Sequence, residues 1–153
     1  MTPPRIRRVL VTGSRDWTDR EAVYQNLFRE RVNGVGRGFG GMIIVHGACP
    51  TGADAIADYW AERCGPANNV RAERHPADWR VCTPGCRHPQ RTRADGTPYC
   101  PQAGHRRNQT MVDLGADVCV AFPLPQSRGT HDCVRRALAA GIPVLTVSAA
   151  VPA

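Results

Sequence analysis

Short apolar runs alternate along the chain with longer segments whose apolar residues recur at helical spacing. Nearly continuous apolar runs are typical of strands covered on both faces, whereas a period of 3.6 residues is typical of helices. The runs predict five strands, over residues 5–12, 42–45, 70–75, 117–122 and 142–147. The intervening segments predict four helices, over residues 16–32, 51–64, 105–114 and 130–140.

Polar and small residues set the expected limits of these elements. Asp19 is a suitable N-cap for the first helix, whose apolar side is expected to consist of Ala22, Val23, Leu27 and Phe28. The glycine-rich stretch 34–41 predicts a loop, and Gly65 followed by Pro66 is expected to end the second helix.

Strands that alternate with helices predict right-handed crossovers and therefore an α/β, Rossmann-like fold, with a doubly wound parallel sheet of about five strands. Residues 80–103 do not fit this pattern, because they lack periodicity and are rich in proline, glycine, arginine and cysteine. A chain of 153 residues suits one domain. We therefore expect residues 1–153 to form a single domain that carries a cysteine-rich insertion over residues 80–103.

The composition of the chain bears on the cellular compartment in which the protein is expected. No apolar run approaches the roughly 20 residues of a membrane helix, and no signal-peptide core follows the basic N-terminus. The odd number of cysteines, seven, argues against a disulfide framework, so Cys49, Cys64, Cys119 and Cys133 are expected to be small buried side chains. These features predict a cytoplasmic protein that does not contact a membrane.

The net charge of +7 is compatible with an anionic ligand, because all twenty basic residues are arginine. A coding bias against lysine would explain the same composition, so the charge by itself decides little.

Candidate binding residues cluster where four loops would meet. Ligands of open parallel sheets bind beyond the carboxyl ends of the strands. Glycine lets the backbone approach a ligand, and helix N-termini and arginine side chains suit phosphate. The candidates are Gly13, Ser14, Arg15, Gly47, Ala48, Thr51, Gly52, Asp54, Arg107, Asn108, Gly129 and Thr130.

Any one of these loops is equally well explained by ordinary turn and capping residues, and Asp54 by the dipole of the following helix. Several such loops at one sheet edge favour a phosphate-binding site. The motif G-x-x-x-x-G-K-[ST] is absent and no G-x-G-x-x-G follows the first strand, which disfavours an ordinary P-loop NTPase or a dinucleotide dehydrogenase.

Five motifs resemble the YspA-like branch of the SLOG superfamily, which is related to the Lonely guy phosphoribohydrolases and to DNA-processing protein A. They are VTGSRDW (11–17), VHGACPTGAD (45–54), RHPADW (74–79), RRNQTM (106–111) and SRGTHD (127–132). The resemblance implies a Rossmann-like fold, binding of nucleotides or nucleotide-derived signals, and often a homodimer.

The resemblance also suggests an enzymatic alternative. Lonely guy enzymes release a base from a nucleoside monophosphate with an arginine in R-K-x-x-M and a glutamate in G-G-x-G-T-x-x-E. Arg107 matches that arginine, but Cys133 stands at the glutamate position. Asp132, one residue earlier, is then the candidate acid/base group beside Arg107. The resemblance therefore implies binding more strongly than N-glycosidase activity.

The cysteine-rich insertion contains soft metal ligands in a segment that cannot form a core. Zinc prefers a closed set of four sulfur and imidazole donors, and binding it would supply ordering energy. The predicted ligands of a structural zinc ion are Cys82, Cys86, His88 and Cys100. We prefer His88 to His105, which lies beside the binding-loop arginines. A metal-free flexible loop is the alternative.

Nucleic-acid binding is a further alternative, because Arg87, Arg91 and Arg93 lie in the same insertion. It is disfavoured because Tyr99 is the only aromatic residue there, which leaves little support for base stacking.

Overall fold

The computed structural model describes residues 2–149 and confirms the predicted parallel α/β architecture. Five parallel strands form one sheet in the order β3-β2-β1-β6-β7. The strands are β1 (Arg5–Gly13), β2 (Phe39–His46), β3 (Val70–Arg74), β6 (Val118–Phe122) and β7 (Val144–Thr146). The strand order reverses beside β1, so the loops after β1 and β6 lie next to each other at the carboxyl edge.

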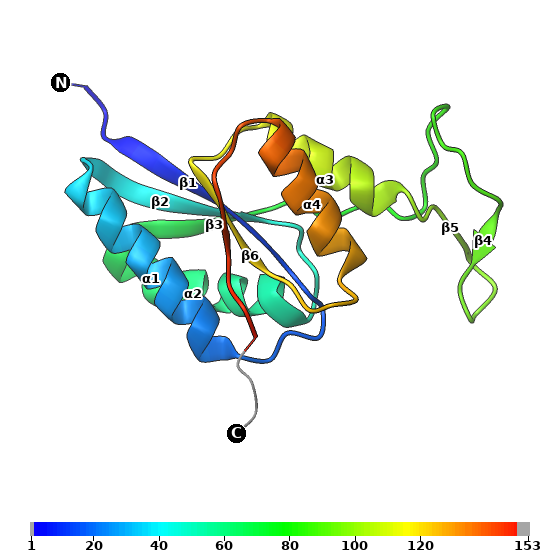
Figure 1. The fold of residues 1–153 in the computed structure, drawn as a ribbon, viewed down its shortest axis with the longest axis horizontal. Coiled ribbons are helices and arrows are strands. Elements are labelled where there is room, and N and C mark those ends of the chain that lie inside the picture. Colours follow the sequence, from blue (N-terminus) through cyan, green and yellow to red (C-terminus); the bar gives the residue numbers. More distant parts are fainter. Residues whose placement is uncertain (1, 150–153) are drawn as a thin grey trace.

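Two helices cover each face of the sheet (Figure 1). On one face lie α1 (Arg20–Gly36) and α2 (Gly52–Asn68), and on the other lie α3 (Ala103–Asp113) and α4 (Arg128–Ala139). Successive strand residues point to opposite faces. Val9 and Val11 therefore pack under α1 and α2, whereas Leu10 packs under α3 and α4.

Two predicted boundaries were wrong, and both errors involve glycine. The glycine-rich stretch 34–41 lies mostly in a helix and a strand and not in a loop, because α1 continues to Gly36 and β2 begins at Phe39. Helix α2 runs past Gly65 and Pro66 and ends at Asn68, and it is followed by the C-cap residue Asn69, whose backbone is left-handed. A Cβ at Gly65 would collide with the carbonyl oxygen of Val70, so this glycine allows β3 to pass close to the helix.

Three predicted core positions also differ. Phe28 is 54% exposed, because it follows Leu27 by one residue and points about 100° away from the buried side of α1. Cys49 and Cys64 are only partly buried, whereas Cys119 and Cys133 are fully buried as expected.

The cysteine-rich insertion lies between β3 and α3 and extends away from the sheet (Figure 1). It contains a short antiparallel hairpin of β4 (Arg91–Thr92) and β5 (Pro98–Tyr99). Across residues 2–149, no helix has the length and apolar character needed to span a membrane.

Candidate functional site

A cavity of about 340 Å³ opens at the carboxyl edge of the sheet, where the loops after β1, β2 and β6 meet the start of α3. We call this cavity the pocket. Nine of the predicted binding residues line it: Gly13, Ser14, Arg15, Gly47, Asp54, Arg107, Asn108, Gly129 and Thr130. Ala48, Thr51 and Gly52 do not line it, although they belong to the same loop as Gly47.

The loops after β1 and β2 pack directly on each other. The carbonyl oxygen of Ser14 accepts hydrogen bonds from the N–H groups of Trp17 and Ala53, both at 3.2 Å. A Cβ at Gly13 would collide with the side chain of Ala53, and Gly52 has a left-handed backbone (φ +74°) against Ser14. These two glycines are therefore needed for loop packing.

The turn after β2 has its backbone donors satisfied within the chain. Asp54 accepts hydrogen bonds from the N–H groups of Gly47 (3.1 Å) and Cys49 (3.3 Å). Nδ1 of His46 accepts one from Ala48 (3.0 Å), so its Nε2 carries the proton that is donated to Asp58 (2.8 Å). The N–H groups of this turn are therefore occupied by Asp54 and His46. Burial raises the pKa of the Asp54 carboxyl group.

Arg107 lines the pocket, and part of its guanidinium is hydrogen-bonded to the protein. Its Nη1 donates to the carbonyl oxygens of Gly47 and His75, and its Nε donates to Asn108 at 3.1 Å. Its Nη2 has no hydrogen-bond partner among the residues that the structure describes. One edge of the guanidinium is therefore available to a ligand.

The start of α4 supplies the other open donors. Residues 2–149 provide no hydrogen-bond acceptor for the N–H groups of Gly129 and Thr130. A Cβ built at Gly129 would meet no atom within 4 Å, so the space in front of this turn is open. Asn108 holds the turn in place by donating to the carbonyl oxygen of Gly129 at 3.2 Å.

Asp132 and Cys133 lie behind this turn and do not line the pocket. The Asp132 carboxylate accepts hydrogen bonds from Asn108 (3.1 Å), Arg135 (2.7 Å) and Arg136 (2.9 Å). Burial alone would raise the pKa of Asp132, but these donors outweigh it and the pKa is lowered. Burial raises the pKa of the Cys133 thiol to about 11.

Twelve of the residues that line the pocket were not among the predicted binding residues, and they include Arg128 and Trp79. Arg128 precedes the predicted Gly129–Thr130 pair, and Trp79 ends the quoted RHPADW motif. Trp79 follows β3 at the same sheet edge, so the carboxyl-edge rule could have selected it. A single tryptophan in a loop did not otherwise suggest a binding residue.

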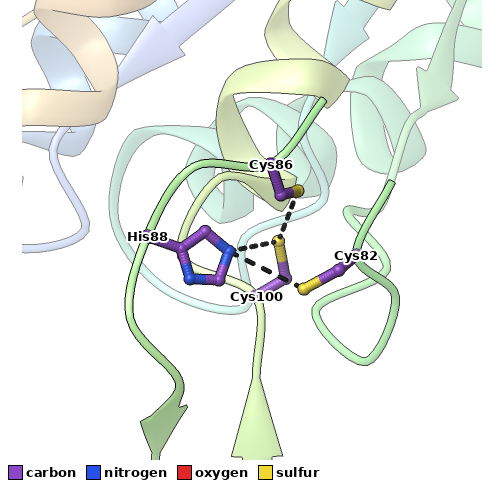
Figure 2. Close-up of side chains that lie close together, drawn as sticks. All are labelled: Cys82, Cys86, His88 and Cys100. Carbon is purple, nitrogen blue, oxygen red and sulfur yellow. Dashed lines mark hydrogen bonds between the residues drawn. The ribbon is translucent and has the colours of Figure 1, made fainter. Parts of the chain in front are cut away.

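The four predicted metal ligands converge in one place (Figure 2). We call Cys82, Cys86, His88 and Cys100 the thiol–imidazole cluster; their ligand atoms all lie within 4.8 Å of one another. Sγ of Cys100 lies 3.6 Å from Sγ of Cys86 and 3.5 Å from Nε2 of His88. Tetrahedral zinc bonds of about 2.0–2.3 Å would separate such atoms by roughly 3.5–3.8 Å. The cluster can therefore hold a metal ion, and His88 is its fourth member.

The surroundings of the thiol–imidazole cluster suit metal ligation. Nδ1 of His88 donates to the carbonyl oxygen of Pro89 at 2.8 Å, which leaves Nε2 as the acceptor that faces the thiols. Nη1 of Arg106 lies 3.0 Å from Sγ of Cys86 and 3.4 Å from Sγ of Cys100. Burial would raise the pKa of Cys100, but hydrogen bonds from Arg106 and His88 outweigh it and lower the pKa to about 6.

The sequence of this chain matches a family model and a curated protein. Residues 7–81 match the model of the YspA, cpYpsA-related SLOG family. The chain is 43% identical over 141 residues to the Gene 61 protein of Mycobacterium phage D29, and the match covers 92% of this chain and 95% of that protein.

A solved structure shares the fold. DNA processing protein A (DprA) from Streptococcus pneumoniae superposes with a TM-score of 0.61 at 16% sequence identity, over 95% of this chain. The chain spans about half the length of that structure (52%), and identity at this level supports a common fold only.

Replacing Asp54 by alanine should destabilise the protein. Asp54→Ala leaves the N–H groups of Gly47 and Cys49 without their acceptor, so we expect the free energy of unfolding to fall by about 1–3 kcal/mol. Thr51→Ala is the matched control, because the Thr51 side chain makes no capping hydrogen bond at the start of the same helix. Equal denaturant midpoints for the two variants would contradict the role assigned to Asp54.

Proposed function

We propose that this chain, which belongs to the YspA, cpYpsA-related SLOG family, binds a nucleotide or nucleotide-derived phosphate ligand in the pocket, as a sensor or sequestering module. The proposal rests chiefly on the hydrogen-bond donors that remain open there. The turn after β2 is closed by Asp54 and His46, whereas Gly129, Thr130 and Nη2 of Arg107 keep free N–H groups. Those donors belong to two separate elements that line one cavity.

Donors of this kind suit a phosphate group. The N–H groups at the start of α4 point along the positive end of the helix dipole, and an arginine adds a charge-assisted hydrogen bond. Arg15 and Arg128 are exposed on the rim of the same pocket and add positive charge. A cavity of about 340 Å³ falls at the lower end of the range for small-molecule sites, which favours a mononucleotide-sized ligand.

Hydrolysis of the ligand is the weaker alternative. An N-glycosidase needs an acid/base group within reach of the bound substrate. Asp132 is turned away from the pocket and held by three donors, and Cys133 is buried with a raised pKa. The arrangement favours a binding protein over an enzyme.

We further propose that the thiol–imidazole cluster binds a structural zinc ion. Three thiolates and a neutral imidazole around Zn²⁺ would carry one net negative charge, which the guanidinium of Arg106 is placed to balance. The surrounding residues of the insertion are mostly exposed and form no apolar core. Metal bonds would therefore supply much of the ordering energy of this segment.

The homodimer and the cytoplasmic location remain predictions. Phe28, Val32 and Val35 form an exposed apolar stripe on α1, which is a surface that a second copy would bury. Nucleic-acid binding through the insertion stays the least favoured alternative, because its one tyrosine is already covered by Arg93 at 5.2 Å.

Gly129→Val should weaken ligand binding strongly without unfolding the protein. A side chain there meets no atom of the protein, but it would fill the space through which a phosphate reaches the N–H groups of α4. We expect a ten- to hundred-fold loss of affinity, which corresponds to about 1.5–3 kcal/mol. Titration calorimetry with AMP, GMP, CMP and UMP, beside thermal melts, measures both effects.

Gly36→Val is the matched control, because Gly36 also has open space beside it but lies at the end of α1, outside the pocket lining. Wild-type protein that binds none of the four nucleotides, or a Gly129→Val variant with unchanged affinity, would contradict the proposed site.

Release of free base from these nucleotides should be slow or absent, because Asp132, the candidate acid/base group, does not line the pocket and is held by three donors. Chromatography of the reaction mixture measures the free base. Turnover of about 1–1,000 per second that Asp132→Asn abolishes would establish the enzymatic alternative.

Protein purified without added metal should contain about one zinc ion per chain by elemental analysis. Cys86→Ser should remove the metal while most of the circular dichroism of the sheet and helices persists. Cys64→Ser serves as control, because this partly buried cysteine of α2 is no part of the cluster. Full metal content in Cys86→Ser, or metal-free wild-type protein with a protease-resistant insertion, would refute the zinc site.

A further inference from the structure

Trp79 differs from the other two tryptophans of the chain. Trp17 and Trp60 are core residues, with 3% and 6% of their surface exposed. Trp79 is only partly buried, and it lines both the pocket and a neighbouring groove on the cysteine-rich insertion. The guanidinium of Arg15, which also lines the pocket, lies over the Trp79 ring, so one face of the indole is turned toward this cavity.

We propose that Trp79 recognises the base of the ligand, which stacks on the indole while the phosphate binds at the start of α4. The inference rests on the proposed function and extends it, because it distinguishes a nucleotide from other phosphate compounds. Aromatic side chains are effective stacking partners for any base, since every base presents a π-face.

Arg15 occupies the place that the base would take. Its guanidinium carbon lies 5.7 Å from the centre of the Trp79 ring, which is near the outer limit for a cation–π contact. The Arg15 side chain is exposed, and its guanidinium makes no hydrogen bond to another residue of the described chain. A planar base can displace it, and the charge of Arg15 would stay on the pocket rim.

The thiol–imidazole cluster fixes the position of Trp79. The carbonyl oxygen of Trp79 accepts a hydrogen bond from the N–H group of Cys100 at 2.6 Å, and Cys100 is a member of the cluster. Arg106 joins the same parts, because it contacts two cluster thiols and donates to the carbonyl oxygen of Val81 at 2.6 Å.

Helix α3 limits where the indole can lie. A Cβ at Gly104 would come within 2.9 Å of Cη2 of Trp79, so the ring rests on the bare backbone of the helix. The same helix carries Arg107 into the pocket. The thiol–imidazole cluster, the indole of Trp79 and Arg107 are thus connected to one another through α3 and the segment that precedes it.

The decisive experiment compares ligands with and without a base. Titration calorimetry would measure AMP, GMP, CMP and UMP against ribose 5-phosphate, which has the sugar and phosphate alone. We expect wild-type protein to bind at least one nucleotide ten-fold or more tightly than ribose 5-phosphate. Trp79→Leu, which keeps an apolar side chain against Gly104, should lose that difference and bind ribose 5-phosphate as before.

Three further variants test the assignment. Trp79→Phe should retain part of the preference for the nucleotide, and nucleotide binding should quench tryptophan fluorescence in the wild type but not in this variant. Tyr99→Leu removes the aromatic ring of the insertion that lies outside the pocket and should change nothing. Cys86→Ser should reduce nucleotide affinity but not ribose 5-phosphate affinity, because it disturbs the cluster that positions Trp79.

The outcomes separate this inference from the proposed function. Equal affinities of wild-type protein for nucleotides and ribose 5-phosphate, or equal losses for both in Trp79→Leu, would overturn base recognition and leave phosphate binding intact. Absence of binding by every probe would overturn both. A Cys86→Ser variant with full preference for the nucleotide would show that the cluster does not position Trp79.

Discussion

The hydrogen bonds that Asp54 accepts from the turn after β2 determine what the carboxyl edge of the sheet can bind. They occupy the N–H groups of Gly47 and Cys49, while His46 occupies that of Ala48. An anion in the pocket would therefore find no free backbone N–H group in the turn after β2, whereas the start of α4 offers free N–H groups. This is why we propose the phosphate-binding position at the loop after β6 and not at the loop after β2.

The fold could be predicted because the central strands β1, β2 and β6 are buried on both faces, so that their apolar runs identify them without any contact information. The limits of elements were harder to predict. Gly65 and Pro66 are helix-ending residues in most settings, but here the glycine is needed where β3 crosses α2. Propensity alone cannot reveal such a close approach between two distant segments.

The thiol–imidazole cluster could be predicted because cysteine and histidine have few other roles in an exposed polar segment. Nine of the twelve predicted binding residues line the pocket, since the carboxyl-edge rule selects them. Their individual roles could not be predicted. Asp54 and Gly13 were expected to face a ligand, yet each also stabilises the packing of the loops. These roles depend on contacts between loops that are distant in the sequence, and residue spacing does not reveal such contacts. The match to the family model ends at residue 81, just before Cys82, so the cluster lies outside the matched segment.

The position of β1 at the centre of the sheet has a consequence for how the chain folds. It pairs with β2 on one side and with β6, more than a hundred residues later, on the other, where Val9 is opposite Val118. Contacts across such long separations form late, because a large loop must close first. During synthesis, the backbone N–H and C=O groups on this edge of β1 stay unpaired until β6 has left the ribosome, and an unpaired strand edge can associate with other chains. The pocket, which needs both neighbours of β1, is among the last features of the molecule to form.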